Sequence, residues 1–267
     1  MSQSNPTAAA DPPVREPATT PPATASPGEP ATASPGGAAA AGRGPTGTLL
    51  AAGVAAGPVY VLVSVAQMLT RDGFDPTRHA WSLLANGGAG WIQATNLIVT
   101  GLLVVAGAVG LRRTLDPGRA STWAPRLLGV YGLGLVGGGI FRADPAQGFP
   151  PGTPEQGTGT SWHGLLHFGL GGVGFVALVA ACLVLARRFA ADGRPGWAIF
   201  SRLTGAVFLA GFVAVATGAG SAWATLSFTA SIVLAWAWLS LMSAYHRAPV
   251  SASRQAPMAA SRPGSSR

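Results

Sequence analysis

Hydrophobic positions form long runs, and short segments rich in arginine, proline and glycine separate them. Between Arg43 and Arg71 there are 27 residues without an acidic side chain or an arginine, and between Glu155 and Arg187 there are 31. About 20 mainly apolar residues form a helix that crosses the ~30 Å hydrocarbon core of a bilayer. Runs of this length predict an all-α protein built from transmembrane helices.

Six helices account for the runs. The stretch between Arg202 and Arg247 has 44 residues, too many for one span, so we expect two helices with a turn near residues 218–221. The stretch between Arg126 and Arg142 has only 15 residues, so this helix must begin earlier, with Arg126 extending its side chain to the interface. The expected helices cover residues 48–69, 91–111, 122–142, 162–186, 200–218 and 223–245.

The segments on either side of this membrane domain, which spans residues 48–247, have another composition. Residues 1–47 hold 10 of the 22 prolines, among alanine, threonine, serine and glycine, and residues 248–267 are polar and rich in serine and proline. A chain with so little to bury cannot offset the conformational entropy that folding removes. We therefore expect both tails to be disordered.

Composition and charge narrow the class of protein. Only 10% of the residues are charged, against about 25% in an average globular protein, which excludes a soluble globular domain. The net charge of +8 comes from arginines spread between the apolar runs, so nucleic-acid binding is not indicated and the lipid bilayer is the expected partner. The sequence indicates no particular protein partner. Its abundance of arginine, glycine, alanine and proline is typical of a GC-rich bacterial genome.

The arginines also predict an orientation. Residues 112–126 and 187–202 each carry four arginines, whereas residues 71–90 and 142–161 carry three between them, together with acidic residues. Cytoplasmic loops of membrane proteins carry an excess of basic residues. We expect the two arginine-rich loops and both tails to lie in the cytoplasm, and the other loops to face outward from a bacterial inner membrane.

Within the expected helices, two pairs of glycines lie four residues apart, Gly53 with Gly57 and Gly134 with Gly138. Such pairs allow close approach of helix backbones in membranes. The alternative is that glycine is simply frequent in this composition.

Candidate chemistry gathers in the outward loops and the adjoining helix starts. His163 and His167 are four residues apart, so they share a helix face and could bind one metal ion, with Asp144 or His79 as a third ligand. Ser82 follows His79 by three residues. We name the whole set the outer polar cluster: Arg78, His79, Ser82, Gln93, Arg142, Asp144, His163 and His167.

The outer polar cluster allows several functions. It could be a packed structural cap in which Asp144 pairs with Arg142 or Arg78. The function that we favour is binding or passing a small solute or a lipid head group. The first alternative is a metal-dependent hydrolase acting on lipid, with a zinc-activated water and with Ser82 and Asp144 as catalytic candidates. This alternative loosely resembles the membrane ceramidase and adiponectin-receptor superfamily. A membrane scaffold is a further alternative, and the sequence leaves open whether any catalysis occurs.

Three motifs resemble a family of bacterial membrane proteins catalogued as domain of unknown function 998. They are Arg-His-Ala-Trp-Ser-Leu-Leu at residues 78–84, Gly-Ile-Phe-Arg-Ala-Asp-Pro at 139–145 and His-Gly-Leu-Leu-His at 163–167. The resemblance covers about residues 50–245 and implies a six-helix architecture without implying a reaction. A more distant likeness to six-span Frag1-type proteins concerns the fold alone.

Overall fold

The computed structural model describes residues 44–218 and 220–248, and every regular element in this part of the chain is helical. This confirms the predicted all-helical class. The described helices are α2 (Pro45–Thr70), the short 3₁₀ helix η1 (Trp81–Ala85), α3 (Gly90–Thr114), α4 (Arg119–Ile140), α5 (Trp162–Ala191), α6 (Pro195–Thr217) and α7 (Ala222–Arg247).

The tails that we expect to be disordered lie almost wholly outside the described residues. One boundary differs, because α2 begins at Pro45, inside the predicted N-terminal tail. Proline suits the first turn of a helix, since its φ angle is already helical and its missing N–H would have no partner there. α5 also continues beyond the predicted end, to Ala191.

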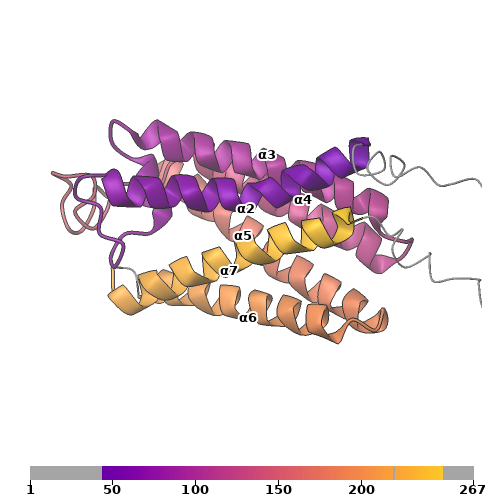
Figure 1. Cartoon of the computed structure of the whole chain (residues 1–267). Helices are drawn as coiled ribbons and strands as arrows, with labels where there is room; N and C mark the ends of the chain where they lie inside the picture. The colour runs from indigo at the N-terminus through magenta and orange to yellow at the C-terminus, as the bar shows by residue number, and fades with distance from the viewer. Residues whose placement is uncertain (1–43, 219, 249–267) are drawn as a thin grey trace, which may run out of the picture. The chain divides into compact units, whose positions relative to one another are not determined.

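The six long helices of the described region form a ring. Each packs against its neighbours in the chain, and α7 returns to pack against α2 (Figure 1). Contacts across the ring are few, with α3 touching α7 only slightly. A ring of this kind leaves space in its middle wherever side chains do not fill it.

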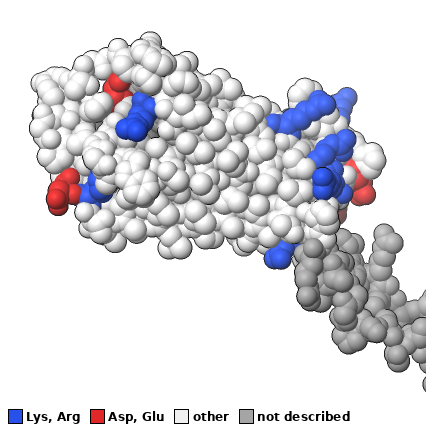
Figure 2. Space-filling model, turned by 90° about the horizontal axis from the view of Figure 1, so that it is seen from above, with Lys and Arg blue, Asp and Glu red and all other residues white. Residues whose placement is uncertain are grey.

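The connections between the helices alternate between two ends of the ring. Residues 71–89 and 141–161, the end of α6 and the start of α7 lie at one end, which we call the outer end, and the α3–α4 and α5–α6 turns lie at the other (Figure 1). Figure 2 shows basic side chains crowded at one end of the helices and few at the opposite end. The arginines next to the α3–α4 and α5–α6 turns are Arg112, Arg113, Arg119, Arg126, Arg187, Arg188, Arg194 and Arg202.

Five of the described helices are long and apolar enough to cross a membrane by length and composition: α2, α3, α5, α6 and α7. α4 does not meet the same criterion, so the predicted number of six spans is not established by composition. The reason lies in its sequence, which contains Arg119, Arg126 and many glycines. Glycine contributes little hydrophobicity, although it allows close packing against α3 and α5.

Glycines bring α4 and α5 into backbone contact. A Cβ atom at Gly134 would lie 2.8 Å from the Leu170 carbonyl oxygen and 3.1 Å from the Gly174 Cα atom. Between α2 and α3, a Cβ atom at Gly53 would lie 3.2 Å from the Gly107 Cα atom. These positions therefore require glycine for packing, whatever the composition of the genome.

Candidate functional site

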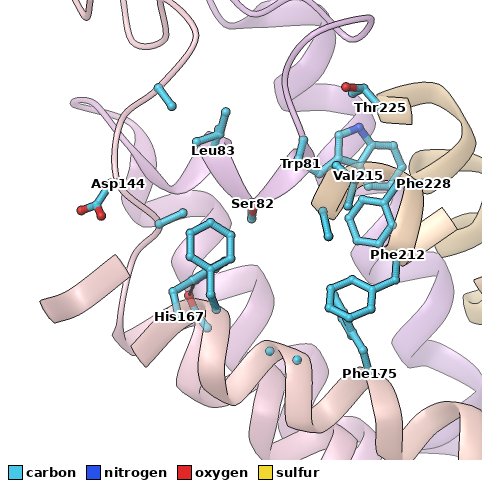
Figure 3. A pocket seen from close by; sticks show the side chains of 18 of the residues that line it. Trp81, Ser82, Leu83, Asp144, His167, Phe175, Phe212, Val215, Thr225 and Phe228 are labelled. Atoms are coloured by element: carbon cyan, nitrogen blue, oxygen red, sulfur yellow. Dashed lines mark hydrogen bonds between the residues drawn. The ribbon is translucent and has the colours of Figure 1, made fainter. Parts of the chain in front are cut away.

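A cavity of about 580 Å³ lies inside the ring near the outer end. Its walls come mainly from α4, α5, α6 and α7, and η1 and the loop over residues 143–160 border its mouth (Figure 3). This volume falls within the range of pockets that bind small molecules, roughly 300–1,000 Å³. The sequence predicted a polar surface at this end, but it did not predict a cavity.

Aromatic side chains form the deep part of the cavity. Tyr60 stacks on Trp236 with ring centroids 4.8 Å apart, and both line the cavity. Phe175 makes edge contacts with Phe208 at 5.1 Å and with Phe212 at 5.2 Å. Figure 3 shows Phe175 and Phe212 on the side of the cavity opposite Asp144 and His167. The deep part therefore favours an apolar group.

Polar side chains lie around the mouth. Four members of the outer polar cluster line the cavity: Arg78, Ser82, Asp144 and His167. Gln147 and Thr225 also line it. The cavity is therefore polar at the outer end and aromatic toward the middle of the ring, an arrangement that matches an amphipathic molecule.

Asp144 is held at the N-terminus of α5. Its carboxylate accepts hydrogen bonds from the backbone N–H of Ser161, at 2.8 Å, and from the Ser161 hydroxyl. The same hydroxyl oxygen accepts a hydrogen bond from the Gly164 N–H, at 3.1 Å, and so completes the N-cap of α5. A negative charge at this position is also favoured by the helix dipole.

The predicted pairing of Asp144 with Arg142 or Arg78 is wrong. Among the described residues no basic nitrogen lies within 4.0 Å of its carboxylate, and Arg78 pairs instead with Glu155. The Arg142 side chain is exposed at the surface. The carboxylate thus borders the cavity with hydrogen-bond donors beside it but without a cationic partner in the described chain.

His167 faces the cavity from α5. Its Nδ1 atom lies 3.1 Å from the Gly138 carbonyl oxygen and 2.9 Å from the Phe141 carbonyl oxygen, so Nδ1 carries the proton and donates it. Nε2 has no hydrogen-bond partner among the described residues. A neutral His167 therefore offers an acceptor to a ligand.

His79 has a structural role behind the mouth, where it is only 3% exposed. Its Nδ1 accepts a hydrogen bond from the Asp75 N–H at 2.9 Å, so Nε2 must carry the proton that it donates to the Gln147 carbonyl oxygen at 2.8 Å. His79 thereby joins the two outer loops, and its ring also contacts Phe74 and Phe149. Both ring nitrogens are occupied, so His79 is not free to bind a metal ion.

Asp75 begins the turn that places His79. Its carboxylate accepts hydrogen bonds from the Thr77 hydroxyl at 2.7 Å and from the Thr77 backbone N–H at 2.8 Å. These bonds favour the ionised form, so they hold the pKa of Asp75 below its ordinary value.

The remaining members of the cluster lie elsewhere. His163 is exposed and its ring contacts that of Trp162, with centroids 3.6 Å apart. It does not line the cavity with His167. Gln93 is buried between α2 and α3, where its side-chain oxygen accepts a hydrogen bond from Gln67 at 2.8 Å. Across residues 44–218 and 220–248, no three His, Cys, Asp or Glu side chains come close enough to hold one metal ion. The predicted zinc site has no ligand set in this region.

Sequence reasoning missed several residues of the cavity wall, and Trp81 is one of them. Trp81 is 3% exposed and lines the cavity, and its indole N–H has no hydrogen-bond partner among the described residues. The indole nitrogen has almost no accessible surface, so the ring borders the cavity and its N–H does not. Sequence alone does not distinguish a tryptophan on the inside of the ring from one on its lipid-facing side.

Comparison with known proteins identifies the family but no activity. The chain belongs to the family described as protein of unknown function (DUF998), whose model matches residues 54–245. No curated protein and no solved structure matches the chain. The match covers the whole ring of helices that encloses the cavity, apart from the first turns of α2 and the last residues of α7.

Proposed function

We propose that this member of the DUF998 family is a six-span protein of the bacterial cytoplasmic membrane that binds a small amphipathic molecule in its outward-facing cavity. The ligand would be a small solute or a lipid head group with an attached apolar part. The observation that carries the proposal is the cavity of about 580 Å³, with polar residues at its mouth and aromatic residues in its depth. The same cavity could hold a ligand or pass it across the outer part of the membrane.

Position and length support α4 as the sixth span. Its 22 residues measure roughly 33 Å at 1.5 Å per residue, enough for the hydrocarbon core. It packs between α3 and α5, which are both apolar enough to span. Leu133 and Ile140 are exposed on its outer surface, as expected of a lipid-facing helix.

Aromatic residues and arginines support the orientation. Trp91, Trp162 and Trp223 stand at the starts of α3, α5 and α7, all at the outer end, and each is 61% exposed. Tryptophan is enriched where a bilayer meets water, while arginines are enriched on the cytoplasmic side. These features support our proposal that the outer end faces away from the cytoplasm and that both tails lie in the cytoplasm.

Cysteine labelling tests the orientation. The chain has a single cysteine, Cys182, which is buried, so added cysteines report their own surroundings. We expect a membrane-impermeant maleimide to label Thr158→Cys in intact cells and to label Gly193→Cys only after the membrane is opened. Labelling in the reverse order would refute the orientation.

A cavity-filling substitution tests binding. A Cβ atom at Gly138 would lie 3.6 Å from the His167 ring, an ordinary contact, so the side chain of Gly138→Leu would occupy the cavity without forcing helices apart. Gly129→Leu on the same helix is the matched control, because Gly129 has open space around it and does not line the cavity. The probe is a fluorescent single-chain phospholipid added to the purified protein.

We expect Gly138→Leu to weaken binding about tenfold or more, the size of effect that a few methylene groups have in an apolar pocket. The Gly129→Leu control should bind as the wild type does. Saturable binding that is the same in both variants would contradict the assignment of the site to this cavity, and no saturable binding by the wild type would contradict the function itself.

A further inference from the structure

We infer that the ligand of the proposed site is a zwitterionic phospholipid of the outer leaflet, and that it enters the cavity sideways, through an opening between the outer halves of α5 and α6. This inference rests on the proposed function and specifies the class of ligand and its route. We call this opening the α5–α6 portal and define it by Phe168, Gly171 and Gly172 on α5 and by Phe212, Val215 and Ala216 on α6.

The cavity reaches the outside of the ring at the portal. All six portal residues line the cavity, yet Phe168 is 66% exposed and Ala216 is exposed as well. A residue that lines a cavity and keeps most of its surface accessible lies at an opening in the wall. The cavity therefore has a side opening in addition to its mouth.

α5 and α6 are in contact toward the cytoplasmic end and separate toward the outer end. A Cβ atom at Gly205 of α6 would lie 3.1 Å from the Cys182 Cβ atom of α5, and Phe175 still touches Phe212. Further out along α5 the contact is lost. A Cβ atom at Gly171 would have no atom within 4 Å, and the nearest neighbour of one at Gly172 would be Phe212, at 3.9 Å. Glycine at both positions leaves the gap between the helices unfilled.

The portal lies at a depth that faces lipid chains. Phe168 is six residues beyond the exposed Trp162, which amounts to roughly 9 Å along the helix. The surface beside the portal is apolar, with exposed Leu165, Val173 and Val213. A molecule that enters here comes from the hydrocarbon region of the outer leaflet, and the rest of a two-chain lipid can stay in the bilayer while one part occupies the cavity.

The charges at the mouth select the head group. The cavity wall carries one cationic side chain, Arg78, and one anionic side chain, Asp144. Asp144 has no cationic partner in the described chain, so it suits an ammonium group. Arg78 uses one guanidinium nitrogen for its ion pair with Glu155, and its other N–H donors suit phosphate oxygens. An acyl chain would lie against Phe175, Phe208 and Phe228. Phosphatidylethanolamine combines these features, whereas an anionic head group would leave Asp144 facing a like charge.

A portal-blocking variant tests the route. Gly171→Trp places a large side chain in the gap without a clash at Cβ, and Gly169→Trp is the matched control, because Gly169 also has open space around it but does not line the cavity. The full-length proteins are reconstituted in nanodiscs with phosphatidylethanolamine carrying a photoreactive group on its acyl chain. Crosslinks to the segment around Phe228 are then quantified by mass spectrometry.

We expect Gly171→Trp to reduce this crosslinking about tenfold and Gly169→Trp to leave it within about twofold of the wild type. A water-soluble, single-chain phosphoethanolamine added from outside reaches the cavity through the mouth, so both variants should still bind it. That binding also shows that Gly171→Trp is folded.

The outcomes separate the inference from the function on which it rests. Binding of neither lipid by the wild type would remove the proposed function. Crosslinking that is equal in Gly171→Trp and the wild type would overturn lateral entry while leaving the function in place. Loss of both ligands in Gly171→Trp, with both retained in Gly169→Trp, would overturn a side entrance separate from the mouth, since one substitution would then block both routes. Equal crosslinking by phosphatidylglycerol would overturn the head-group assignment.

Discussion

Replacing Gly134 by alanine is a direct test of how the wall of the cavity is built. Gly134 lies on α4 where that helix meets α5, and it lines the cavity. Its added methyl group would meet backbone atoms of α5, the Leu170 carbonyl oxygen at 2.8 Å and the Gly174 Cα atom at 3.1 Å. Ordinary contact begins near 3.4 Å. A backbone cannot rotate out of the way as a side chain can, so the two helices must separate.

Separation of the helices sets the size of the effect. Overfilling a well-packed interface costs typically 1–3 kcal/mol, because contacts along the whole seam are stretched. Alanine also gains roughly 1 kcal/mol over glycine from helix propensity, which offsets part of that cost. We therefore expect Gly134→Ala to lower the free energy of unfolding by up to about 2 kcal/mol, and by about 1–3 kcal/mol relative to an alanine substitution that gains helix propensity alone.

A second alanine substitution on the same helix provides the control. A methyl group added at Gly129 would have no atom of another residue within 4 Å, so Gly129→Ala should keep the gain in helix propensity and be neutral or stabilising. Both variants would be unfolded with denaturant in detergent micelles and followed by circular dichroism. If Gly134→Ala were as stable as Gly129→Ala, the close approach of α4 and α5 would be refuted.

Three further predictions concern the outer loops. Ser161→Ala removes the N-cap of α5 and a partner of the Asp144 carboxylate. The free energy of unfolding, measured in a thermal melt, should fall by about 0.5–2 kcal/mol. An unchanged melt would contradict the capping role. His79→Ala leaves the Asp75 N–H and the Gln147 carbonyl without their partner. The free energy of unfolding should fall by about 1–3 kcal/mol in the same melt. Retained stability would show that water replaces the ring. Hydrogen bonds from Thr77 lower the pKa of Asp75 in the folded state. Ionised Asp75 therefore stabilises the fold at a pH above its unfolded pKa, and this contribution is lost as the pH falls through its folded pKa. Thr77→Val should therefore move acid unfolding to higher pH, and an acid transition at the same pH would refute this contribution.

Helix positions could be predicted from the sequence because they depend on local pattern. A helix that crosses a bilayer needs a run of about 20 apolar residues, and such runs can be recognised directly in the sequence. The ends of α3 and α7 therefore lie within a few residues of the prediction. The contact made by Gly53 and Gly57 could also be predicted from local pattern, because residues four apart lie on the same face of one helix. Which helix would meet that face could not be predicted, because it depends on residues from α3 and α7 that are distant in the chain.

Histidines of the outer polar cluster show where sequence reasoning stops. His79, His163 and His167 were candidates for one metal site, but the fold gives them three different surroundings. His79 is bonded between two loops, His163 is exposed against Trp162, and His167 faces the cavity. Residue type and spacing do not determine these surroundings, because the partners are groups that only the folded loops and helices bring near.

The sequence by itself determined the helical class, the approximate ends of the helices and the uneven distribution of arginine between the two ends. Tertiary structure alone decided the ring, the cavity and the α5–α6 portal. The physical reason is that lipid and protein interior are equally apolar, so a helix that spans a membrane is apolar on every side. Phe168 is largely exposed and Phe208 is buried, although both are phenylalanines in apolar helices that line the same cavity. Only the packing of six helices around a common centre distinguishes a side chain that faces lipid from one that faces a ligand.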